Sequence, residues 1–337
     1  MDEFFPWLSD AWARLSARRS ALPHAILIRG RSGLGKTALA RRFAQGLLCD
    51  SPLPDGGPCG QCAACGWFSQ GNHPDFRQVE PEILAVAGAP EEGAASPRAE
   101  SASKQIRIEQ VRELQGFLAI GAHRGGMRIV LVRPAEAMNT ATANALLKSL
   151  EEPGPRTLFI LVSSQPQRLL PTVRSRCQAV DVGLASHEAA RAWLRGRDVK
   201  DPEAALAFAG AAPLAVLEQA GAADVRTRLL DELLRRPFHP LAAADRCATV
   251  EPPTLVDVLQ KWTHDLARCA IGLPARYFPG HAPALRELST NADRAALLRF
   301  GRDLSRAKGM SQHPLNARLF VEDLFIRYAA TQGNGHA

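Results

Sequence analysis

The stretch GRSGLGKT, residues 30–37, matches the phosphate-binding pattern G-x-x-x-x-G-K-[ST] at every fixed position. An apolar run before it predicts a strand, and Lys36–Leu48 after it predicts a helix. In such a strand–loop–helix context, backbone N–H groups bind phosphate oxygens, the lysine reaches the β- and γ-phosphates, and the threonine hydroxyl ligates Mg²⁺. A plain glycine turn is the alternative, but the lysine and threonine favour a nucleotide-binding loop. The residues expected to bind ATP are Gly30, Gly33, Gly35, Lys36 and Thr37.

Short apolar runs recur along the first half of the chain and alternate with helical patterns. Residues 24–30, 128–133 and 157–164 are continuous and rich in Val, Ile and Leu, as strands buried on both faces are. Residues 178–183 could add a further strand. The helices expected between these strands are Lys36–Leu48, Ile106–Ile120 and Thr140–Glu151. This alternation predicts a parallel, three-layer α/β sheet of the P-loop class.

Strand patterns stop after about Ala185, and the remaining sequence is helical in pattern. We therefore expect three domains. The first is an α/β domain over residues 1–184, the second a small helical domain over 185–221, and the third an all-α domain over 222–337. Within the first, residues 82–103 are rich in Ala, Gly, Pro, Ser and Glu and lack periodicity. That composition predicts a mobile surface loop.

The acidic residues that ATP hydrolysis requires after a second strand are missing from this sequence. ATP hydrolysis in this class requires an Asp at the end of a neighbouring strand to hold Mg²⁺, usually with another acid beside it. The best candidate strand is Ile129–Val132, and it is followed by Arg133 and Pro134, which can neither ligate a cation nor act as a base. Glu136 is the nearest carboxylate, and it is expected on the loop. The sequence therefore predicts that nucleotide binding is possible and that hydrolysis is weak or absent.

Four cysteines are closely spaced just after the first expected helix. They follow the pattern C-x9-C-x2-C-x2-C within residues 49–65, and such spacing suits a tetrahedral Zn²⁺ site. An iron–sulfur cluster is the rival, but ferredoxin motifs continue with C-x3-C-P, which is missing here. We expect a structural zinc module with the ligands Cys49, Cys59, Cys62 and Cys65. The other cysteines are isolated and expected to pack as small apolar side chains.

Composition narrows the class of protein without identifying it. The chain has 337 residues, of which 46% are hydrophobic and 22% charged, and these fractions are ordinary for soluble globular proteins. The net charge of +7 is compatible with a polyanionic partner, and equally with a basic surface that keeps the protein soluble. No apolar run approaches the length of a membrane span, and the acidic, aromatic N-terminus is unlike a signal peptide. We expect a cytoplasmic protein with no membrane partner.

A cysteine module inserted after the first helix of a P-loop domain resembles the bacterial clamp-loader ATPase family, a branch of the AAA+ proteins. The resemblance covers most of residues 1–220. It implies that residues 185–221 form a lid domain and that residues 222–337 form the collar through which five subunits assemble into a ring. The further stretches that carry the resemblance are HPDF (73–76), IRIEQVREL (106–114), ANALLKSLEEP (143–153) and LLPTVRSRC (169–177).

The resemblance also implies a role for Arg176. Motor subunits of this family take an arginine finger from the neighbouring subunit through a Ser-Arg-Cys motif, which Ser175, Arg176 and Cys177 match. Non-hydrolysing members keep this arginine and act on the ATP of a neighbour. The segment 210–215 lacks the arginine with which active members contact nucleotide, which favours the non-hydrolysing interpretation. From the local sequence alone, Arg176 could instead pair with a nearby acid or face solvent.

By resemblance, the chain is therefore expected to be a non-hydrolysing subunit of the clamp loader in the bacterial DNA polymerase III holoenzyme. Its partners would be gamma/tau and delta subunits in a hetero-pentameric ring, with the sliding clamp and primer–template DNA reached through the complex. One alternative is an active ATPase motor subunit that uses Glu136 or an acid elsewhere in the chain. Another is a zinc-dependent nucleic-acid-binding module, although CGQCAACGWF (59–68) has no basic residue for phosphate contacts.

Overall fold

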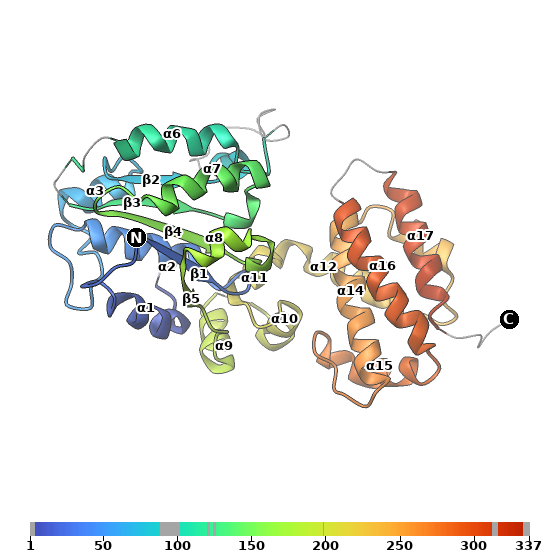
Figure 1. Ribbon diagram of the computed structural model, residues 1–337. Coiled ribbons are helices and arrows are strands. Elements are labelled where there is room, and N and C mark those ends of the chain that lie inside the picture. Colours follow the sequence, from blue (N-terminus) through green and yellow to red (C-terminus); the bar gives the residue numbers. More distant parts are fainter. Residues whose placement is uncertain are drawn as a thin grey trace. The chain divides into compact units, whose positions relative to one another are not determined.

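Five short strands form a parallel sheet in the first part of the chain (Figure 1). The computed structural model describes residues 4–87, 102–119, 122–123, 126–197, 199–311 and 316–332. The strands lie in the order β2-β3-β4-β1-β5. Their bounds are β1 Ala25–Arg29, β2 Phe76–Val79, β3 Arg128–Val132, β4 Thr157–Ser163 and β5 Gln178–Asp181. The prediction of a parallel α/β sheet is confirmed.

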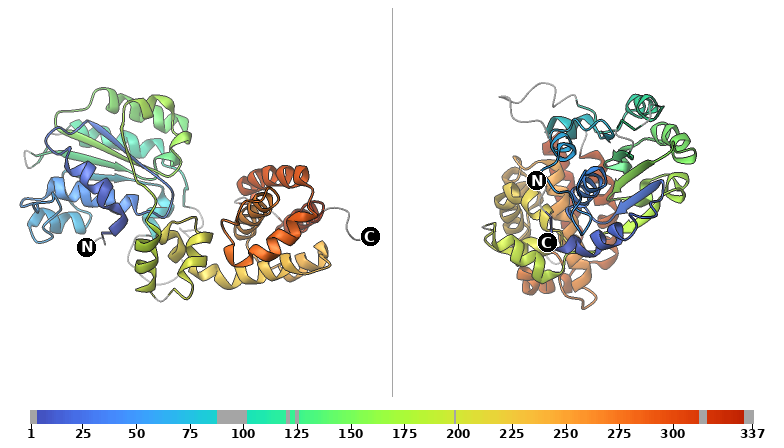
Figure 2. Two further views of the ribbon diagram at one scale, coloured as in Figure 1. Left: turned by 90° about the horizontal axis from the view of Figure 1, so that it is seen from below. Right: turned by 90° about the vertical axis from the view of Figure 1, so that its left-hand side faces the viewer.

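Helices cover both faces of this sheet, with α6 and α7 on one face and α1 and α2 on the other (Figures 1 and 2). Alternate residues of the central strands point to opposite faces, so that Leu27, Val130 and Phe159 belong to one core with the apolar residues of α6 and α7. The helices of this part are α1 Ser9–Ser16, α2 Lys36–Leu48, α3 Ala63–Ser69, α4 Glu82–Ala87, α6 Ile108–Ala119, α7 Thr140–Glu151 and α8 Pro171–Ser175.

All strands run in the same direction, so their carboxyl ends meet at one edge of the sheet. Val79 of β2 lies opposite Val132 of β3, and Leu27 of β1 lies opposite Leu161 of β4. The residues that directly follow β1, β2, β3 and β4 therefore emerge side by side. Ligand sites of open α/β sheets form at this edge, where the loops leave the strands.

Two features of this part differ from the sequence-based expectation. Strand β2 was not predicted, because only two of its four residues, Phe76 and Val79, are buried, and so it lacks the continuous apolar pattern. The expected loop over residues 82–103 begins instead with helix α4, and the Glu82 carboxylate pairs with Arg107 at 2.8 Å. Residues 88–101 of that expected loop lie outside the described residues.

The chain divides into two compact units, residues 1–189 and 190–337, and the second is helical. Its longest helix, α14, packs against α16 and α17 around a core that includes Leu259 and Trp262. Trp262 Nε1 donates a hydrogen bond to Tyr328 Oη at 2.9 Å inside this core. The helices from α9 on are α9 His187–Arg195, α10 Pro202–Phe208, α11 Pro213–Glu218, α12 Ala223–Leu234, α13 Pro240–Arg246, α14 Pro252–Cys269, α15 Ala282–Thr290, α16 Arg294–Met310 and α17 Ala317–Ala329. The predicted division into three domains at residues 184 and 221 stays a prediction.

Short 3₁₀ turns complete the fold. Each of them precedes a helix, and two of them follow strands β3 and β4. Their bounds are η1 Pro6–Leu8, η2 Ala135–Ala137, η3 Pro166–Arg168, η4 Ala220–Ala222 and η5 Pro279–His281. No helix in the described part of the chain has the length and apolarity that a membrane span requires.

Candidate nucleotide and metal sites

The loop between β1 and α2 has the geometry of a phosphate cradle. Gly33 and Gly35 adopt left-handed backbone conformations with φ of 75° and 83°, which glycine reaches without steric cost. Helix α2 begins directly after Gly35, so its free N–H groups and positive dipole end face the loop. All five residues predicted to bind nucleotide, Gly30 to Thr37, therefore belong to one strand–loop–helix unit.

Residues near the N-terminus pack against this loop. Trp7 Nε1 donates a hydrogen bond to the carbonyl oxygen of Leu34 at 3.0 Å, and the rings of Trp7 and Phe5 stack. A Cβ added to Gly35 would lie 2.6 Å from the Phe5 ring. Because that approach is closer than real carbon contacts, glycine at position 35 is required by packing as well as by its φ angle.

Lys36 is drawn into the loop. Its residue is only 5% exposed, and Nζ donates a hydrogen bond to the carbonyl oxygen of Arg31 at 2.5 Å. Burial lowers the pKa of Lys36 to about 8, while the negative charge of Glu136 opposes this shift. The Glu136 carboxylate in turn accepts a hydrogen bond from the backbone N–H of Ser164 at 2.9 Å, just after β4. Lys36 is thus held at the sheet edge by a hydrogen bond to the loop backbone, within reach of the negative charge of Glu136.

The residue that follows β3, Arg133, forms an ion pair. Arg133 Nη2 lies 2.5 Å from Glu80 Oε2, and the two side chains are 25% and 13% exposed. Glu80 follows β2 just as Arg133 follows β3. Both line a hollow of about 430 Å³ that also includes Thr37 and Arg41. The sequence located Arg133 as the replacement of an acid, but it did not reveal Glu80, because strand β2 was not recognised.

Arg176 lies at the C-terminal end of α8, before β5. Its Nη2 pairs with Glu151 Oε1 at 2.6 Å, and its Nη1 donates to the carbonyl oxygen of Thr172 at 3.0 Å. The side chains of Arg176 and Glu151 are 35% and 48% exposed, so the pair is accessible from outside the chain. Within the chain, Arg176 thus pairs with a nearby acid, which is one of the alternatives that its local sequence left open.

The four predicted zinc ligands come together. Their Sγ atoms all lie within 4.8 Å of one another, and all four cysteines are free thiols. Cys49 Sγ lies 3.5 Å from that of Cys59, 3.8 Å from that of Cys62 and 3.6 Å from that of Cys65. Four Zn–S bonds of about 2.3 Å at tetrahedral angles separate the sulfurs by about 3.8 Å. The donor set therefore fits Zn²⁺ in both chemistry and spacing.

Local backbone geometry supports this cluster. Backbone N–H groups of Gln61 and Cys62 donate to Cys59 Sγ and lower the pKa of that thiol to about 6, whereas burial raises the pKa of Cys65 to about 12. A bound divalent cation would favour the thiolate at the buried position. The cluster begins at Cys49, directly after the 13-residue helix α2, so it lies about 20 Å from the phosphate loop along that helix. That separation favours a structural metal over one that contacts phosphate.

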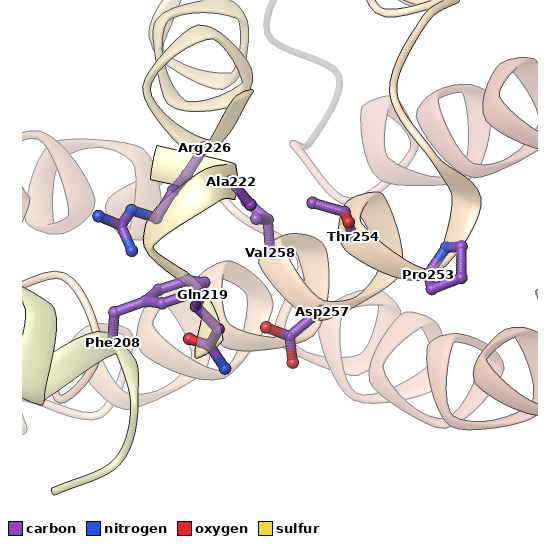
Figure 3. Close-up of a pocket in the computed structure, with 8 residues that line it drawn as sticks. All are labelled: Phe208, Gln219, Ala222, Arg226, Pro253, Thr254, Asp257 and Val258. Carbon is purple, nitrogen blue, oxygen red and sulfur yellow. The ribbon is translucent and has the colours of Figure 1, made fainter. Parts of the chain in front are cut away.

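A further hollow of about 190 Å³ lies in the second unit, between residues of α10, α12 and α14 (Figure 3). Gln219 and Asp257 point toward each other across it. Lys261 Nζ lies 3.6 Å from the centroid of the Phe208 ring, which lines the hollow. The same ammonium group pairs with Asp257 at 2.6 Å. Its lining holds Arg226 and Asp257 and none of the residues predicted to bind nucleotide, so we assign no nucleotide site to this hollow.

Comparison with known proteins shows similarity to subunits of DNA polymerase III. A family model described as DNA polymerase III, delta subunit, matches residues 10–184. The chain is 34% identical over 351 residues to the DNA polymerase III subunit delta' of Pseudomonas aeruginosa, covering 99% of this chain and 100% of that protein. It is 32% identical over 223 residues to the subunit delta' of Haemophilus influenzae, covering 65% and 62% of the two chains.

Among solved structures, a DNA polymerase III gamma subunit-related protein from Thermotoga maritima aligns with a TM-score of 0.43 at 17% identity, covering 96% of this chain and 100% of that chain. The match to the Pseudomonas aeruginosa subunit extends over almost the whole of both chains, and the family model covers more than half of this one. The chain therefore belongs to the delta' family of DNA polymerase III subunits.

Proposed function

We propose that this chain is a non-hydrolysing AAA+ subunit of the bacterial clamp loader, which loads the sliding clamp on primed DNA. The observation that carries the proposal is the Arg133–Glu80 ion pair beside Thr37. A guanidinium cannot ligate Mg²⁺, and its partner carboxylate is already neutralised. An intact phosphate loop is thus combined with a sheet edge that is unsuited to hydrolysis.

Glu136 does not replace the missing acid in this proposal. Its carboxylate accepts the N–H of Ser164 and faces the charge of Lys36, so it acts as a structural anchor between the β3 and β4 ends. A general base would need to orient a water molecule at the γ-phosphate. The alternative of an active motor subunit therefore has less support than the non-hydrolysing one.

The active contribution of the chain is Arg176, presented in trans to the ATP site of a neighbouring subunit. Arg176 is partly exposed at the end of a short helix, and the exposed carboxylate of Glu151 holds it by an ion pair. Exposed ion pairs are worth about 0–1 kcal/mol, so exchange of Glu151 for a phosphate is inexpensive. A planar guanidinium can then donate two hydrogen bonds to phosphate oxygens as charge develops.

The remaining parts take supporting roles in this proposal. Residues 185–221 act as a lid, and residues 222–337 act as the collar that assembles with gamma/tau and delta subunits in a hetero-pentameric ring. Relatives of this chain include proteins named DNA polymerase III subunit tau, one of them from Escherichia coli at 30% identity over 170 residues. The sliding clamp and primer–template DNA are contacted through the complex. The cysteine cluster, with one structural Zn²⁺, stabilises the α/β unit.

The test is ATP hydrolysis by a reconstituted complex of this chain with gamma/tau and delta subunits, stimulated by clamp and primed DNA. Arg176→Ala should leave assembly and zinc content intact and reduce stimulated ATPase. Arginine fingers raise the rate of GTP hydrolysis on the order of 10³–10⁵-fold in GTPases. The loss in the mixture should be smaller, because only one of several ATP sites loses its finger. Arg176→Lys should restore little, since an ammonium lacks the planar fork.

The matched control is Arg174→Ala, an exposed arginine in the last turn of the same helix. It should keep full activity, and Glu151→Gln should keep or raise activity because it releases Arg176. The isolated chain should show negligible turnover. Wild-type ATPase in the Arg176→Ala complex would refute the role in trans, and strong turnover by the isolated chain would favour the motor alternative.

A further inference from the structure

We propose that the Arg133–Glu80 ion pair takes the place of Mg²⁺ beside the phosphate loop, so that this loop binds a nucleoside di- or triphosphate without a divalent cation. The proposal goes beyond the role of Arg176, because it concerns a ligand of this chain and not of its neighbour. It rests on the position, burial and charge of side chains at the sheet edge.

The topology places the pair where the cation would lie. Strands β2 and β3 are neighbours, with Val79 opposite Val132, so the next residues of each strand, Glu80 and Arg133, emerge together at the carboxyl edge. The two side chains, in contact at 2.5 Å, line a hollow of about 430 Å³. Thr37, whose hydroxyl would ligate Mg²⁺ in a hydrolysing loop, lines the same hollow.

These residues do not fit a divalent cation. Mg²⁺ requires oxygen ligands in near-octahedral geometry, usually including one or two carboxylates. Among the described residues that line the hollow, Glu80 is the only one with a carboxylate, and its Oε2 is already in contact with the guanidinium. A dication near Thr37 would also meet the fixed positive charge of Arg133 in a partly buried site, where repulsion between like charges is poorly screened.

The same residues fit a polyphosphate. The loop supplies backbone N–H groups and Lys36, and Arg133 adds a planar group with several donors. Arg133 Nε is buried and has no hydrogen-bond partner in the part of the chain that the structure describes. Arg41 brings a second positive charge to the lining against the single charge of Glu80. The site is therefore electropositive before any metal is added.

The test is a binding titration of the full chain with a fluorescent ATP analogue, N-methylanthraniloyl-ATP. It is carried out once without Mg²⁺ and once with about 5 mM Mg²⁺, an excess that saturates the nucleotide. Magnesium should be removed by treating the buffer with chelating resin before protein is added, because a soluble chelator would also compete for zinc. The expected result is a dissociation constant that differs by less than about threefold between the two conditions.

Arg133→Ala supplies the second arm of the test. Without Mg²⁺ this variant should bind the ATP analogue on the order of 10- to 100-fold more weakly than the wild type, because it loses charge-assisted hydrogen bonds to phosphate. Mg²⁺ should restore part of this loss, since Glu80 is then free to ligate the cation, and the double variant Arg133→Ala/Glu80→Gln should not be restored. Arg112→Ala, an exposed arginine on α6, is the matched control and should bind like the wild type.

Three outcomes would overturn the proposal. They are a wild-type affinity that falls tenfold or more without Mg²⁺, the absence of binding in both conditions, and wild-type behaviour of Arg133→Ala. The wild-type comparison decides the matter even if the variant fails to fold. The titration uses the isolated chain, so its failure is distinguishable from failure of the Arg176 experiment, which reads ATP hydrolysis at a neighbouring site.

Discussion

Both arginines that carry the proposed chemistry already have carboxylate partners within the chain. Arg133 and Glu80 form a largely buried pair, whereas Arg176 and Glu151 form an exposed one. Breaking a buried pair leaves an uncompensated charge and is costly, while an exposed pair exchanges partners at little cost. At the residue scale, burial thus separates an arginine that stays in place from an arginine that is available to another subunit.

Glu232 offers a residue-scale test of the structure through pH. Its side chain is 9% exposed and accepts two hydrogen bonds from Arg246, at 2.7 and 2.6 Å. These hydrogen bonds hold the pKa of the Glu232 carboxyl below its usual value, against the opposing effect of burial. Because the folded-state pKa is lowered, the stabilisation is fully present above the unfolded-state pKa of about 4.3 and is lost as pH falls toward the folded-state value.

Glu232→Gln should therefore lower the free energy of unfolding by about 1–3 kcal/mol at pH 7. The difference from the wild type should shrink below about pH 4.5. Urea unfolding at several pH values measures both. Glu203→Gln removes an exposed partner of Arg191 and is the control, with an expected change below about 1 kcal/mol. A difference for Glu232→Gln that stayed constant down to pH 3 would contradict this account.

At the scale of elements, the cysteine module, residues 49–65, contributes Ala64 and Cys65 to the buried apolar residues. It connects α2 to α3, and Cys62 caps α3 by accepting the N–H of Cys65. Phe68 of α3 packs against Phe76 of β2 with ring centroids 4.5 Å apart. Metal binding at the cluster would therefore stabilise the attachment of α3 and β2 to the sheet.

Cys62→Ser should reduce zinc from about one ion per chain to about none and lower the stability of this unit by on the order of several kcal/mol. Elemental analysis and thermal unfolding check the two effects. Gln61→Ala changes an exposed residue of the same module that is not a ligand, and it should keep both zinc and stability. Iron in place of zinc, or an unchanged melting curve for Cys62→Ser, would refute the assignment.

At the scale of the whole molecule, the two compact units have separate cores. The core of the second unit includes Leu259 and Trp262, both fully buried, and its members among the described residues all belong to residues 190–337. A cavity in one core should therefore affect the other unit little, because mutational effects at distant sites without shared contacts are nearly independent.

Leu259→Ala should destabilise the second unit by about 2–5 kcal/mol through the lost burial and the cavity that remains. Hydrogen exchange read by mass spectrometry should show faster exchange in α14, α16 and α17, with protection of the sheet and zinc content unchanged. Leu241→Ala, at a leucine that is 57% exposed, is the matched control. Equal loss of protection in β1 and α14 would show instead that the chain unfolds as one unit.

Local features could be predicted from the sequence. The phosphate loop, the bounds of α2 and α7, and the cysteine spacing were all visible, because each depends on residues close together in the chain. Glycine at a left-handed turn and four thiols within one short segment restrict the chemistry before any tertiary contact is formed. The family assignment was likewise accessible from short motifs in the first two thirds of the chain.

Pairings between distant segments were decided only by the tertiary structure. Strand β2 is short and half exposed, so its sequence lacks a strand pattern until β3 provides its hydrogen bonds. Glu80 and Arg133 are 53 positions apart and meet because parallel strands bring their carboxyl ends to one edge. Ion pairs depend on distance in space and carry no local sequence signal. The sequence by itself thus determined which groups the protein has for binding phosphate and metal, and the tertiary structure decided which charges those groups face.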